Sequence, residues 1–255
     1  MVDFKMKNAY VISPVLNEAR NIPNLLAGWA EIAGAFPGYS FRFLLVDDGS
    51  TDETSTLAAS LARDLGLEIS VLRHETNRGP GAAFATGFSY LLGKVTPEDV
   101  VVTMEGDNTS RIATLKIMLE RLDREDVDVA LASPYAYGGG VTNATLYRII
   151  LSHFANGTVK AFLGITGIHT LSSFFRAYRG HVIITLQGRY GASIITRPGF
   201  ECMIELLKKT MVIGATITEV PMRLDTSLRI GKSKMNVRRT IGGYLRLVVW
   251  SRKWD

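Results

Sequence analysis

The sequence predicts an α/β fold, built on a doubly wound and mostly parallel β-sheet with a C-terminal extension. From residue 9 to residue 133, short apolar runs alternate with longer segments in which apolar residues recur at helical spacing. This alternation is typical of parallel strands joined by right-handed helical crossovers, which cover both faces of the sheet. The 255 residues suffice for one large core, so we expect one main domain.

The first strand is expected at residues 9–13, where the run AYVIS is mostly apolar. Pro14 and the polar pair Asn17 and Glu18 end this strand. Residues 22–36 then carry apolar side chains at helical spacing, and a Pro-Gly pair follows them. The sequence thus predicts a first strand and helix joined by a short polar loop.

The second strand is expected at residues 41–46 and runs directly into Asp47 and Asp48. Ser50 is followed three residues later by a glutamate, which is the spacing of a capping box. That spacing predicts a helix over residues 50–65. The two aspartates are therefore expected at the carboxyl edge of the sheet.

Three further strands are expected at residues 67–72, 99–104 and 127–133. The first of them runs into the glycine-rich segment 77–88, where Gly79 and its small neighbours allow a close approach of the backbone. Beyond residue 137 the alternation loosens, and the remaining elements are expected as helices over 143–162 and 198–211 and strands over 172–178 and 215–220.

Glu105 and Asp107 follow the strand at 99–104, with Gly106 between them. Residues two apart at a strand end share one side of the sheet, so both carboxylates face the same space. Carboxylate oxygens suit Mg²⁺ or Mn²⁺, which complete their coordination with phosphate and water. The alternative is that both are solvated turn residues.

The polar residues at these strand ends share one location. In open α/β sheets, ligands bind outside the carboxyl ends of the strands. The expected edge gathers three pairs of polar side chains: Asn17 and Glu18, Asp47 and Asp48, Glu105 and Asp107. One such pair is explained by a turn or a helix cap, whereas three pairs on one edge indicate a binding site.

Composition narrows the classes of protein. Residues 223–255 hold nine Lys or Arg and two Asp, a net charge of +7 against +5 for the whole chain, so the basic character belongs to the tail. Cys202 is the only cysteine, which excludes an internal disulfide and a cysteine-based zinc site. With no signal-peptide pattern and no apolar run of about 18 residues, the chain is expected in the cytoplasm.

Several strings of the sequence, in their order and spacing, resemble the family 2 glycosyltransferases with the GT-A fold. Within that family they resemble the polyprenyl-phosphate (dolichol-phosphate) mannose synthase-like branch, over nearly the whole chain. The strings are PVLNEARNI (14–22), VDDGSTDET (46–54), NRGPGAAFATGF (77–88), EGD (105–107), SSFFRAY (172–178), GFECMIELL (199–207), EVP (219–221) and RIGKSKM (229–235).

The resemblance implies an enzyme that transfers a sugar, with inversion, from a nucleotide-diphosphate donor, a GDP- or UDP-sugar, to a lipid phosphate. It divides the chain into a nucleotide-sugar-binding half (1–137), an acceptor half (138–222) and a basic loop with an amphipathic helix (223–255). On this interpretation the nucleotide is bound by Pro14, Glu18, Asp47, Asp48 and Gly79.

The same resemblance implies that Asp107, assisted by Glu105, binds Mg²⁺ or Mn²⁺ at the diphosphate. A mobile basic loop would bring three residues onto the donor or acceptor phosphate: Arg229, Ser233 and Lys234. Asp107, Arg229 and Lys234 are thus the expected catalytic residues, and Arg176 is a second candidate for the acceptor phosphate. The alternative for these arginines and the lysine is an ordinary structural or solvated charge.

The sequence departs from the family pattern mostly on the acceptor side. Glu105 stands where the family usually has an aspartate, and Pro134 where an arginine is frequent. Thr170 and Phe174 replace an aspartate and a glycine. A phosphate oxygen is already anionic near neutral pH and needs no base, which agrees with the missing acid at Thr170. No catalytic base is assigned.

Two other functions stay open: a glycosyltransferase that acts on a carbohydrate hydroxyl, and a nucleotide-sugar-binding protein without turnover. A dinucleotide-dependent oxidoreductase is disfavoured because no G-x-G-x-x-G turn follows the first strand. No nucleic-acid recognition motif accompanies the basic tail. The tail TIGGYLRLVVWSRKWD suits either an interfacial helix that holds the enzyme peripherally on the inner face of a membrane or a helix packed on protein.

Overall fold

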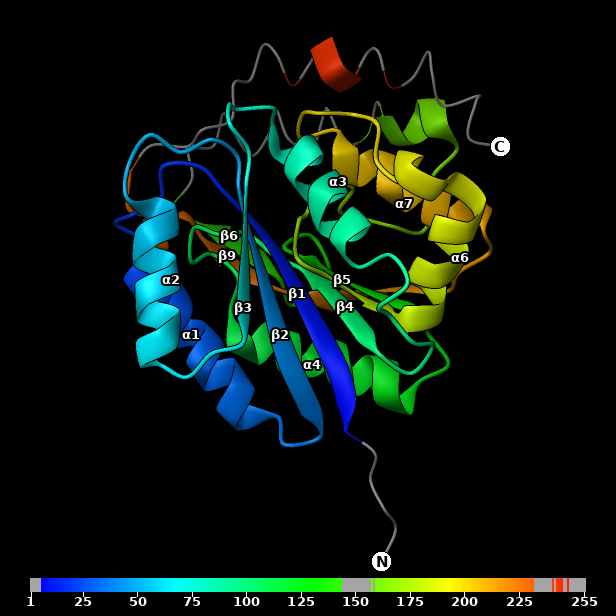
Figure 1. Cartoon of the computed structure of the whole chain (residues 1–255). Coiled ribbons are helices and arrows are strands. Elements are labelled where there is room, and N and C mark those ends of the chain that lie inside the picture. Colours follow the sequence, from blue (N-terminus) through cyan, green and yellow to red (C-terminus); the bar gives the residue numbers. More distant parts are fainter. Residues whose placement is uncertain are drawn as a thin grey trace, which may run out of the picture.

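The computed structural model describes residues 6–143, 157, 159–231, 240, 242–244 and 247. Its centre is a seven-stranded sheet with the order β3-β2-β1-β4-β7-β5-β8 (Figure 1). The strands are β1 (Lys7–Val15), β2 (Tyr39–Asp47), β3 (Ile69–Arg73), β4 (Val100–Thr103), β5 (Val129–Ser133), β7 (Arg176–Arg179) and β8 (Ile217–Pro221).

The strands of this sheet pair in parallel except for β7, which runs antiparallel to both β4 and β5. Helices α1 (Ile22–Ala35), α2 (Thr54–Asp64) and α4 (Ile112–Arg124) pack on one face. Helices α3 (Pro80–Tyr90), α6 (Gly180–Tyr190) and α7 (Cys202–Val212) pack on the other (Figure 1). The predicted doubly wound, mostly parallel fold is confirmed.

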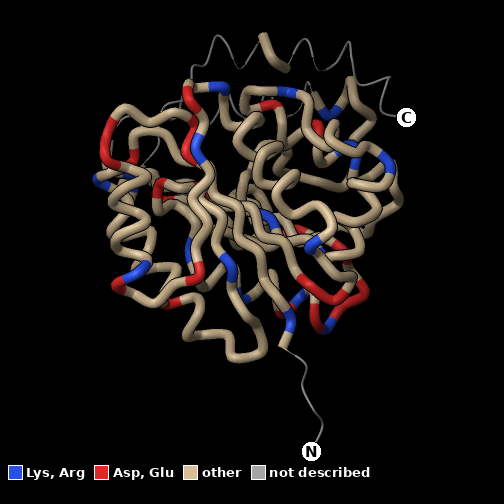
Figure 2. Tube along the Cα trace, in the orientation of Figure 1, with Lys and Arg blue, Asp and Glu red and all other residues tan. Residues whose placement is uncertain are grey.

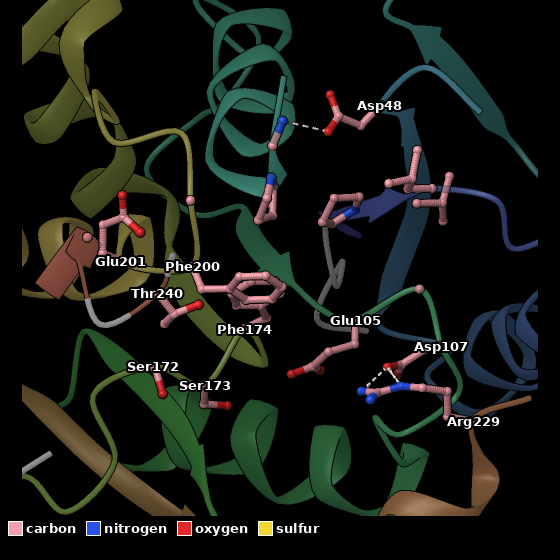
Figure 3. A pocket seen from close by; sticks show the side chains of 18 of the residues that line it. Asp48, Glu105, Asp107, Ser172, Ser173, Phe174, Phe200, Glu201, Arg229 and Thr240 are labelled. Carbon is pink, nitrogen blue, oxygen red and sulfur yellow. Dashed lines mark hydrogen bonds and ion pairs between the residues drawn. The ribbon is translucent and has the colours of Figure 1, made fainter. Parts of the chain in front are cut away.

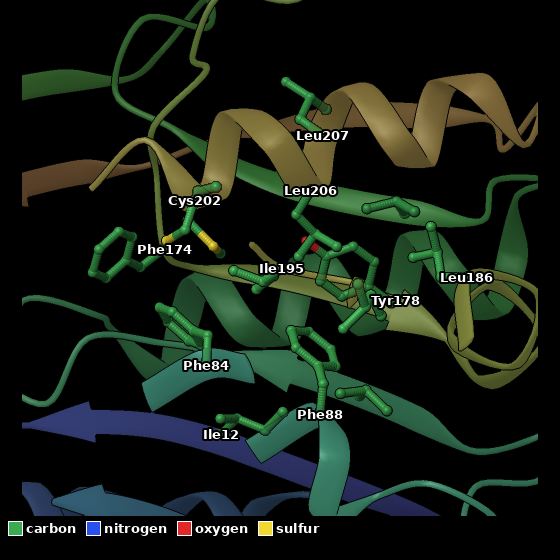
Figure 4. Close-up of a cluster of buried hydrophobic side chains, with 14 of the residues drawn as sticks. Ile12, Phe84, Phe88, Phe174, Tyr178, Leu186, Ile195, Cys202, Leu206 and Leu207 are labelled. Carbon is green, nitrogen blue, oxygen red and sulfur yellow. The ribbon is translucent and has the colours of Figure 1, made fainter. Parts of the chain in front are cut away.

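The two faces have separate apolar cores because successive side chains of a strand point to opposite sides. In β1, Tyr10 and Ile12 enter the core under α3, α6 and α7, whereas Ala9 and Val11 enter the core under α1, α2 and α4. Figure 4 shows the first of these cores, in which Phe84 and Phe88 of α3 lie among side chains of α6 and α7.

Several expected element bounds are corrected. The expected strand 172–178 is only the four-residue β7, because the residues before it form the cavity loop described below. The capping box at Ser50 is wrong: α2 begins at Thr54 and has no side-chain cap, while Ser50 Oγ accepts a hydrogen bond from Asn17 N at 2.8 Å. Most of the helix expected over 143–162 lies outside the described residues.

A small second sheet fixes the segment that leads to Arg229. Strand β6 (Gly140–Thr142) pairs in parallel with β9 (Arg223–Asp225), and the short helix η2 (Thr226–Leu228) follows. Asp225 accepts hydrogen bonds from the backbone N and the Oγ of Ser227, at 3.0 and 2.6 Å, and from Asn143 Nδ2 at 2.8 Å. These hydrogen bonds, from Ser227 first, lower the pKa of Asp225 to about 2.

A buried ion pair on α7 holds the loop before that helix. Glu205 and Lys209 are fully buried, and Lys209 Nζ lies 2.6 Å from Glu205 Oε1. Lys209 also donates to Ser193 O at 2.6 Å, and Glu205 accepts from the backbone amides of Thr196 and Arg197 at 2.9 and 2.8 Å. Both members of the ion pair therefore hydrogen bond to the same loop, residues 193–197.

That loop meets α3 at very close range. Gly81 N donates to Pro198 O at 2.8 Å, and a Cβ at position 81 would lie 1.8 Å from Arg197 O. Only a residue without a side chain fits at Gly81. The contact joins the glycine-rich segment to the loop before α7.

We expect Glu205→Ala to lower the free energy of unfolding by about 3–5 kcal/mol, because Lys209 would keep a buried charge without its partner. Urea denaturation measures the change. Glu98→Ala, at an exposed glutamate, is the control and should change the same quantity by less than about 0.5 kcal/mol. Equal effects of the two substitutions would contradict the structural role of the pair.

We expect Gly81→Ala to lower the free energy of unfolding by about 1–3 kcal/mol or more, because the methyl group collides with a carbonyl oxygen. Gly28→Ala is the matched control: position 28 lies inside α1 with no neighbour within 4 Å of a built Cβ. That control should raise the stability by about 0.5–1 kcal/mol. Thermal unfolding measures both effects. Unfolding temperatures that shift in the same direction in the two variants would contradict the close contact at Gly81.

Candidate active site

The carboxyl edge of the sheet opens into a cavity of about 520 Å³ (Figure 3). It is lined by the loops that follow β1, β2 and β4, by the start of α3, by residues around 172 and 199, and by the segment after η2. Seven of the residues expected in a site line this cavity: Pro14, Glu18, Asp48, Gly79, Glu105, Asp107 and Arg229.

Asp48 is placed by the parallel pairing of β1 and β2, and its backbone N donates to Val15 O at 2.9 Å. Its side chain is buried and accepts hydrogen bonds from the backbone N of Arg78 at 2.9 Å and of Gly79 at 2.7 Å. His74 Nδ1 lies 2.8 Å from Asp48 Oδ1. Asp48 thus ties the end of β2 to the glycine-rich segment.

Gly79 holds a backbone conformation and a place that other residues do not fit. Its φ is 95°, in the left-handed region that favours glycine, and a Cβ would lie 2.3 Å from Pro198 O. Its amide is the one that donates to Asp48. The wall of the cavity at this point is therefore backbone.

Asn21 connects the first loop to the segment that carries Arg229. Asn21 Nδ2 donates to Ile230 O at 3.1 Å, and Ile230 N donates to Asn21 Oδ1 at 3.1 Å. Asn21 Nδ2 also hydrogen bonds to Glu18. The position of Arg229 is thus fixed by an amide side chain at the start of α1.

Asp107 and Glu105 lie just after β4, in a loop packed on β1. A Cβ at Gly106 would lie 2.5 Å from Val15 Cγ1, so glycine alone permits this approach. Asp107 Oδ1 accepts from Thr109 Oγ1 at 2.6 Å, while Asp107 Oδ2 accepts from Arg229 Nε at 2.5 Å and also contacts Arg229 Nη2 (Figure 3).

Glu105 is half-buried, and its side chain accepts a hydrogen bond from Ser110 Oγ. Burial first, and then the charge of Asp107, raise the pKa of the Glu105 carboxyl above its ordinary value. Two neighbouring carboxylates in a poorly hydrated place favour a cation between or beside them.

The donor atoms at this place fit a hard divalent cation. Glu105 and Asp107 offer carboxylate oxygens, the ligands that Mg²⁺ and Mn²⁺ prefer. Nowhere in the described part of the chain do three His, Cys, Asp or Glu side chains gather as a metal group. These two carboxylates therefore suit a cation that takes its remaining ligands from phosphate and water.

The cavity is acidic. Among the described residues, its lining holds five carboxylates and two arginines: Glu18, Asp48, Glu105, Asp107 and Glu201 against Arg197 and Arg229. A diphosphate entering such a lining meets net repulsion unless a cation enters with it.

The structure corrects two of the expected site residues. Asp47 is fully buried outside the cavity and holds the turn before α2, where it accepts from Ser50 N at 2.8 Å and from Ser55 Oγ. The side chain of Asp47 points to the face of the sheet opposite that of Asp48, because the two are consecutive.

Arg176 is the second correction. Its guanidinium is fully buried in β7 and donates to the carbonyl oxygens of Leu171, Ser173 and Met203 at 2.6, 2.8 and 2.8 Å. It does not line the cavity. Arg176 therefore organises the loop around residue 172, and its guanidinium is not presented to the cavity where an acceptor phosphate was expected.

Ser233 and Lys234 lie outside the described residues, as does most of the tail from residue 232 on.

Among the described residues, Lys and Arg are interspersed with Asp and Glu (Figure 2). Within the described part of the chain, no helix is long and apolar enough to cross a membrane.

Sequence reasoning missed much of the other end of the cavity, which is lined by Tyr135, Ser172, Ser173, Phe200, Glu201 and Thr240. Phe200 stacks on Phe174, with ring centroids 5.5 Å apart and an interplanar angle of 14°. The string GFECMIELL contained Phe200 and Glu201, but only the tertiary fold shows that its first residues face the cavity.

Comparisons with known proteins place the chain in a family. The family described as glycosyl transferase family 2 matches residues 10–186. A polyprenol monophosphomannose synthase from Mycolicibacterium smegmatis is 31% identical over 240 residues, 94% of this chain and 85% of that protein. A dolichol-phosphate mannosyltransferase from Pyrococcus furiosus is 28% identical, over 96% of this chain and 64% of that protein.

Solved structures share the fold. The mannosyltransferase PcManGT from Pyrobaculum calidifontis, in complex with GDP-Man and Mn²⁺, has a TM-score of 0.64 and 17% identity, over 98% of this chain and 65% of that chain. S. aureus TarS 1–349 with UDP-GlcNAc has a TM-score of 0.60 and 19% identity, over 95% and 65%. The chain therefore belongs to glycosyl transferase family 2 and is a glycosyltransferase of the GT-A fold that resembles the polyprenyl-phosphate mannose synthases.

Proposed function

We propose that this enzyme moves a sugar from a nucleotide-diphosphate donor to a polyprenyl phosphate or a related lipid phosphate, with inversion at the anomeric carbon and with the help of Mg²⁺ or Mn²⁺. One observation carries the proposal: a single cavity at the carboxyl edge of the sheet contains the paired carboxylates Glu105 and Asp107, Arg229, and the loop ends of β1 and β2. The names of the two relatives, a polyprenol and a dolichol-phosphate enzyme, support the acceptor class.

The nucleotide of a GDP- or UDP-sugar would lie against Pro14, Glu18, Asp48 and Gly79. The ring of Pro14 and the backbone of Gly79 form part of the cavity wall. The carboxylates of Glu18 and Asp48 would accept hydrogen bonds from N–H groups of the base and O–H groups of the ribose. Both kinds of donor occur among the structural neighbours, GDP-Man with PcManGT and UDP-GlcNAc with TarS.

Asp107, assisted by Glu105, would hold the divalent cation at the diphosphate. The cation supplies Lewis-acid stabilisation of the charge that develops on the departing diphosphate. In the structure, the Arg229 guanidinium is paired with Asp107 Oδ2. When donor is bound, the guanidinium would leave this carboxylate and pair with a phosphate oxygen. Ser233 and Lys234 follow in the same basic loop and would act with it on the donor or acceptor phosphate.

The reaction is a single displacement. An oxygen of the acceptor phosphate forms the new bond to the anomeric carbon as the bond from that carbon to the diphosphate oxygen breaks. An anionic phosphate oxygen needs orientation and charge control and no proton acceptor. Thr170, in the place of the family's acid, has its hydroxyl 2.6 Å from Ser133 Oγ and is no base, which agrees with this acceptor. A lipid acceptor would bring the enzyme to the inner membrane surface as a peripheral protein.

We expect a nucleoside diphosphate to raise the thermal unfolding temperature of the wild type more with Mn²⁺ than without it. Saturation at about 100 times the dissociation constant corresponds to roughly 2.7 kcal/mol. Asp107→Ala should abolish this metal-dependent increment, because it removes the proposed ligand. Asp64→Ala, at an exposed position in the last turn of α2, is the control. An undiminished increment in the Asp107 variant would place the cation elsewhere.

We expect Arg229→Met to bind Mn²⁺ more tightly in the absence of nucleotide, because Asp107 loses a competing cation. Transfer should fall by about 100-fold, since the guanidinium no longer stabilises developing phosphate charge. Calorimetric titration of Mn²⁺ and a transfer assay measure the two effects. Arg223→Met, at an exposed arginine of β9, should change neither. Unchanged or weaker Mn²⁺ binding would argue against competition for Asp107.

A further inference from the structure

The end of the cavity away from Asp107 is built around Glu201. Figure 3 shows Glu201 and Thr240 at this end, with Phe174 and Phe200 between them and Glu105. Together with Ser172, these side chains all line the same cavity. The space that begins at the paired carboxylates therefore continues past two aromatic rings to a third carboxylate.

Glu201 is a buried carboxylate without a partner in the described structure. It is only 7% exposed, yet it lines the cavity. Among the described residues, no donor hydrogen bonds to its side chain and no Lys, Arg or His pairs with it. Burying an unpaired carboxylate is costly, so its place at a cavity wall points to a ligand that donates hydrogen bonds.

The carboxylate is seated where two glycines leave room for it. A Cβ at Gly199 would lie 2.4 Å from Glu201 Oε2, and a Cβ at Gly243 would lie 2.5 Å from the same atom. Glu201 is the N-cap residue of α7, but its side chain makes no capping hydrogen bond. The Glu201 carboxylate therefore does not cap the helix, and it lines the cavity instead.

The surroundings of Glu201 match a sugar ring. A carboxylate accepts hydrogen bonds from neighbouring hydroxyl groups. Ser172 and Thr240 make the same part of the cavity wall polar. Phe174 and Phe200 offer aromatic surface for the C–H groups of the ring. A phosphate is disfavoured here because Glu201 repels it, and an isoprenoid chain is disfavoured because it would leave the carboxylate unpaired.

We propose that Glu201 binds the sugar ring of the donor by accepting hydrogen bonds from its free hydroxyls. This assignment rests on the proposed function, in which the donor alone carries a sugar and the acceptor is a lipid phosphate. The sugar is joined to the diphosphate, which would lie at Glu105 and Asp107, and the cavity leads from there to Glu201. Glu201 is a binding residue in this assignment and takes no proton from the substrate.

The test compares the affinity for nucleotide with and without its sugar. Glu201→Gln and the wild type are titrated, in the presence of Mn²⁺, with GDP and GDP-mannose and with UDP and UDP-GlcNAc. We expect the variant to bind the sugar nucleotide preferred by the wild type about tenfold more weakly, because the hydrogen bonds lose their charged acceptor. Binding of the free nucleoside diphosphate should be unchanged. Glu201→Asp keeps the charge on a shorter arm and should show the same selective loss.

Glu98→Gln is the control variant, because Glu98 is exposed and lies just before β4, at the edge of the sheet opposite the cavity. This variant should bind all four ligands as the wild type does. Equal losses for free nucleotide and sugar nucleotide would overturn the assignment, as would no loss for either. Unchanged donor binding with a raised KM for polyprenyl phosphate would also overturn it and move Glu201 to the acceptor. Failure of the wild type to bind any nucleotide with Mn²⁺ would contradict the proposed function itself.

Discussion

The common direction of β1, β2 and β4 is the constraint on which the rest of the molecule depends. In the parallel register, Val15 pairs with Asp47, and Ile12 pairs with Thr103, so the loops after these strands leave the sheet side by side. Backbone hydrogen bonding thus sets the spacing of residues that lie far apart in sequence. The side chains of Asp48 and Asp107 reach one cavity because the strands beneath them are in register.

An excess of negative charge gives this cavity its chemistry. The described lining carries more carboxylates than arginines, and Arg229 is drawn onto Asp107. Such a lining repels a free phosphate compound, and in the proposed function a cation that enters with the donor removes this repulsion. Arg229 lines this cavity while it is paired with Asp107, and the proposed function moves its guanidinium to a phosphate oxygen of the donor.

The strands, their order along the chain and the carboxylates at their ends were predictable because each signal is local: apolar runs, polar strand ends and glycines. The antiparallel β7 was not, since pairing partners depend on tertiary contacts. In the sequence, Asp47 and Arg176 resemble ligand-binding residues. In the structure, Asp47 faces away from the cavity, and Arg176 donates its hydrogen bonds to three carbonyl oxygens.

Other errors have the same origin. Ser50 has the spacing of a cap, yet a hydrogen bond to the neighbouring loop uses its hydroxyl and the helix starts later. Glu201 stands among apolar residues of a helical segment, so periodicity alone does not reveal that it faces a cavity. Its seat depends on Gly199 and on Gly243, which lies some forty residues further along the chain. Long-range packing decides which of the charged residues reach substrate.

The anchors on either side of Arg229 determine how it can move. Asp225 ties the chain just before it through Ser227 and Asn143, and Ile230 is held directly after it by Asn21. With both anchors in place, a change of partner from carboxylate to phosphate requires only rotation about side-chain bonds. The proposed exchange of partners therefore breaks the ion pair with Asp107 but leaves the backbone on both sides of Arg229 in place.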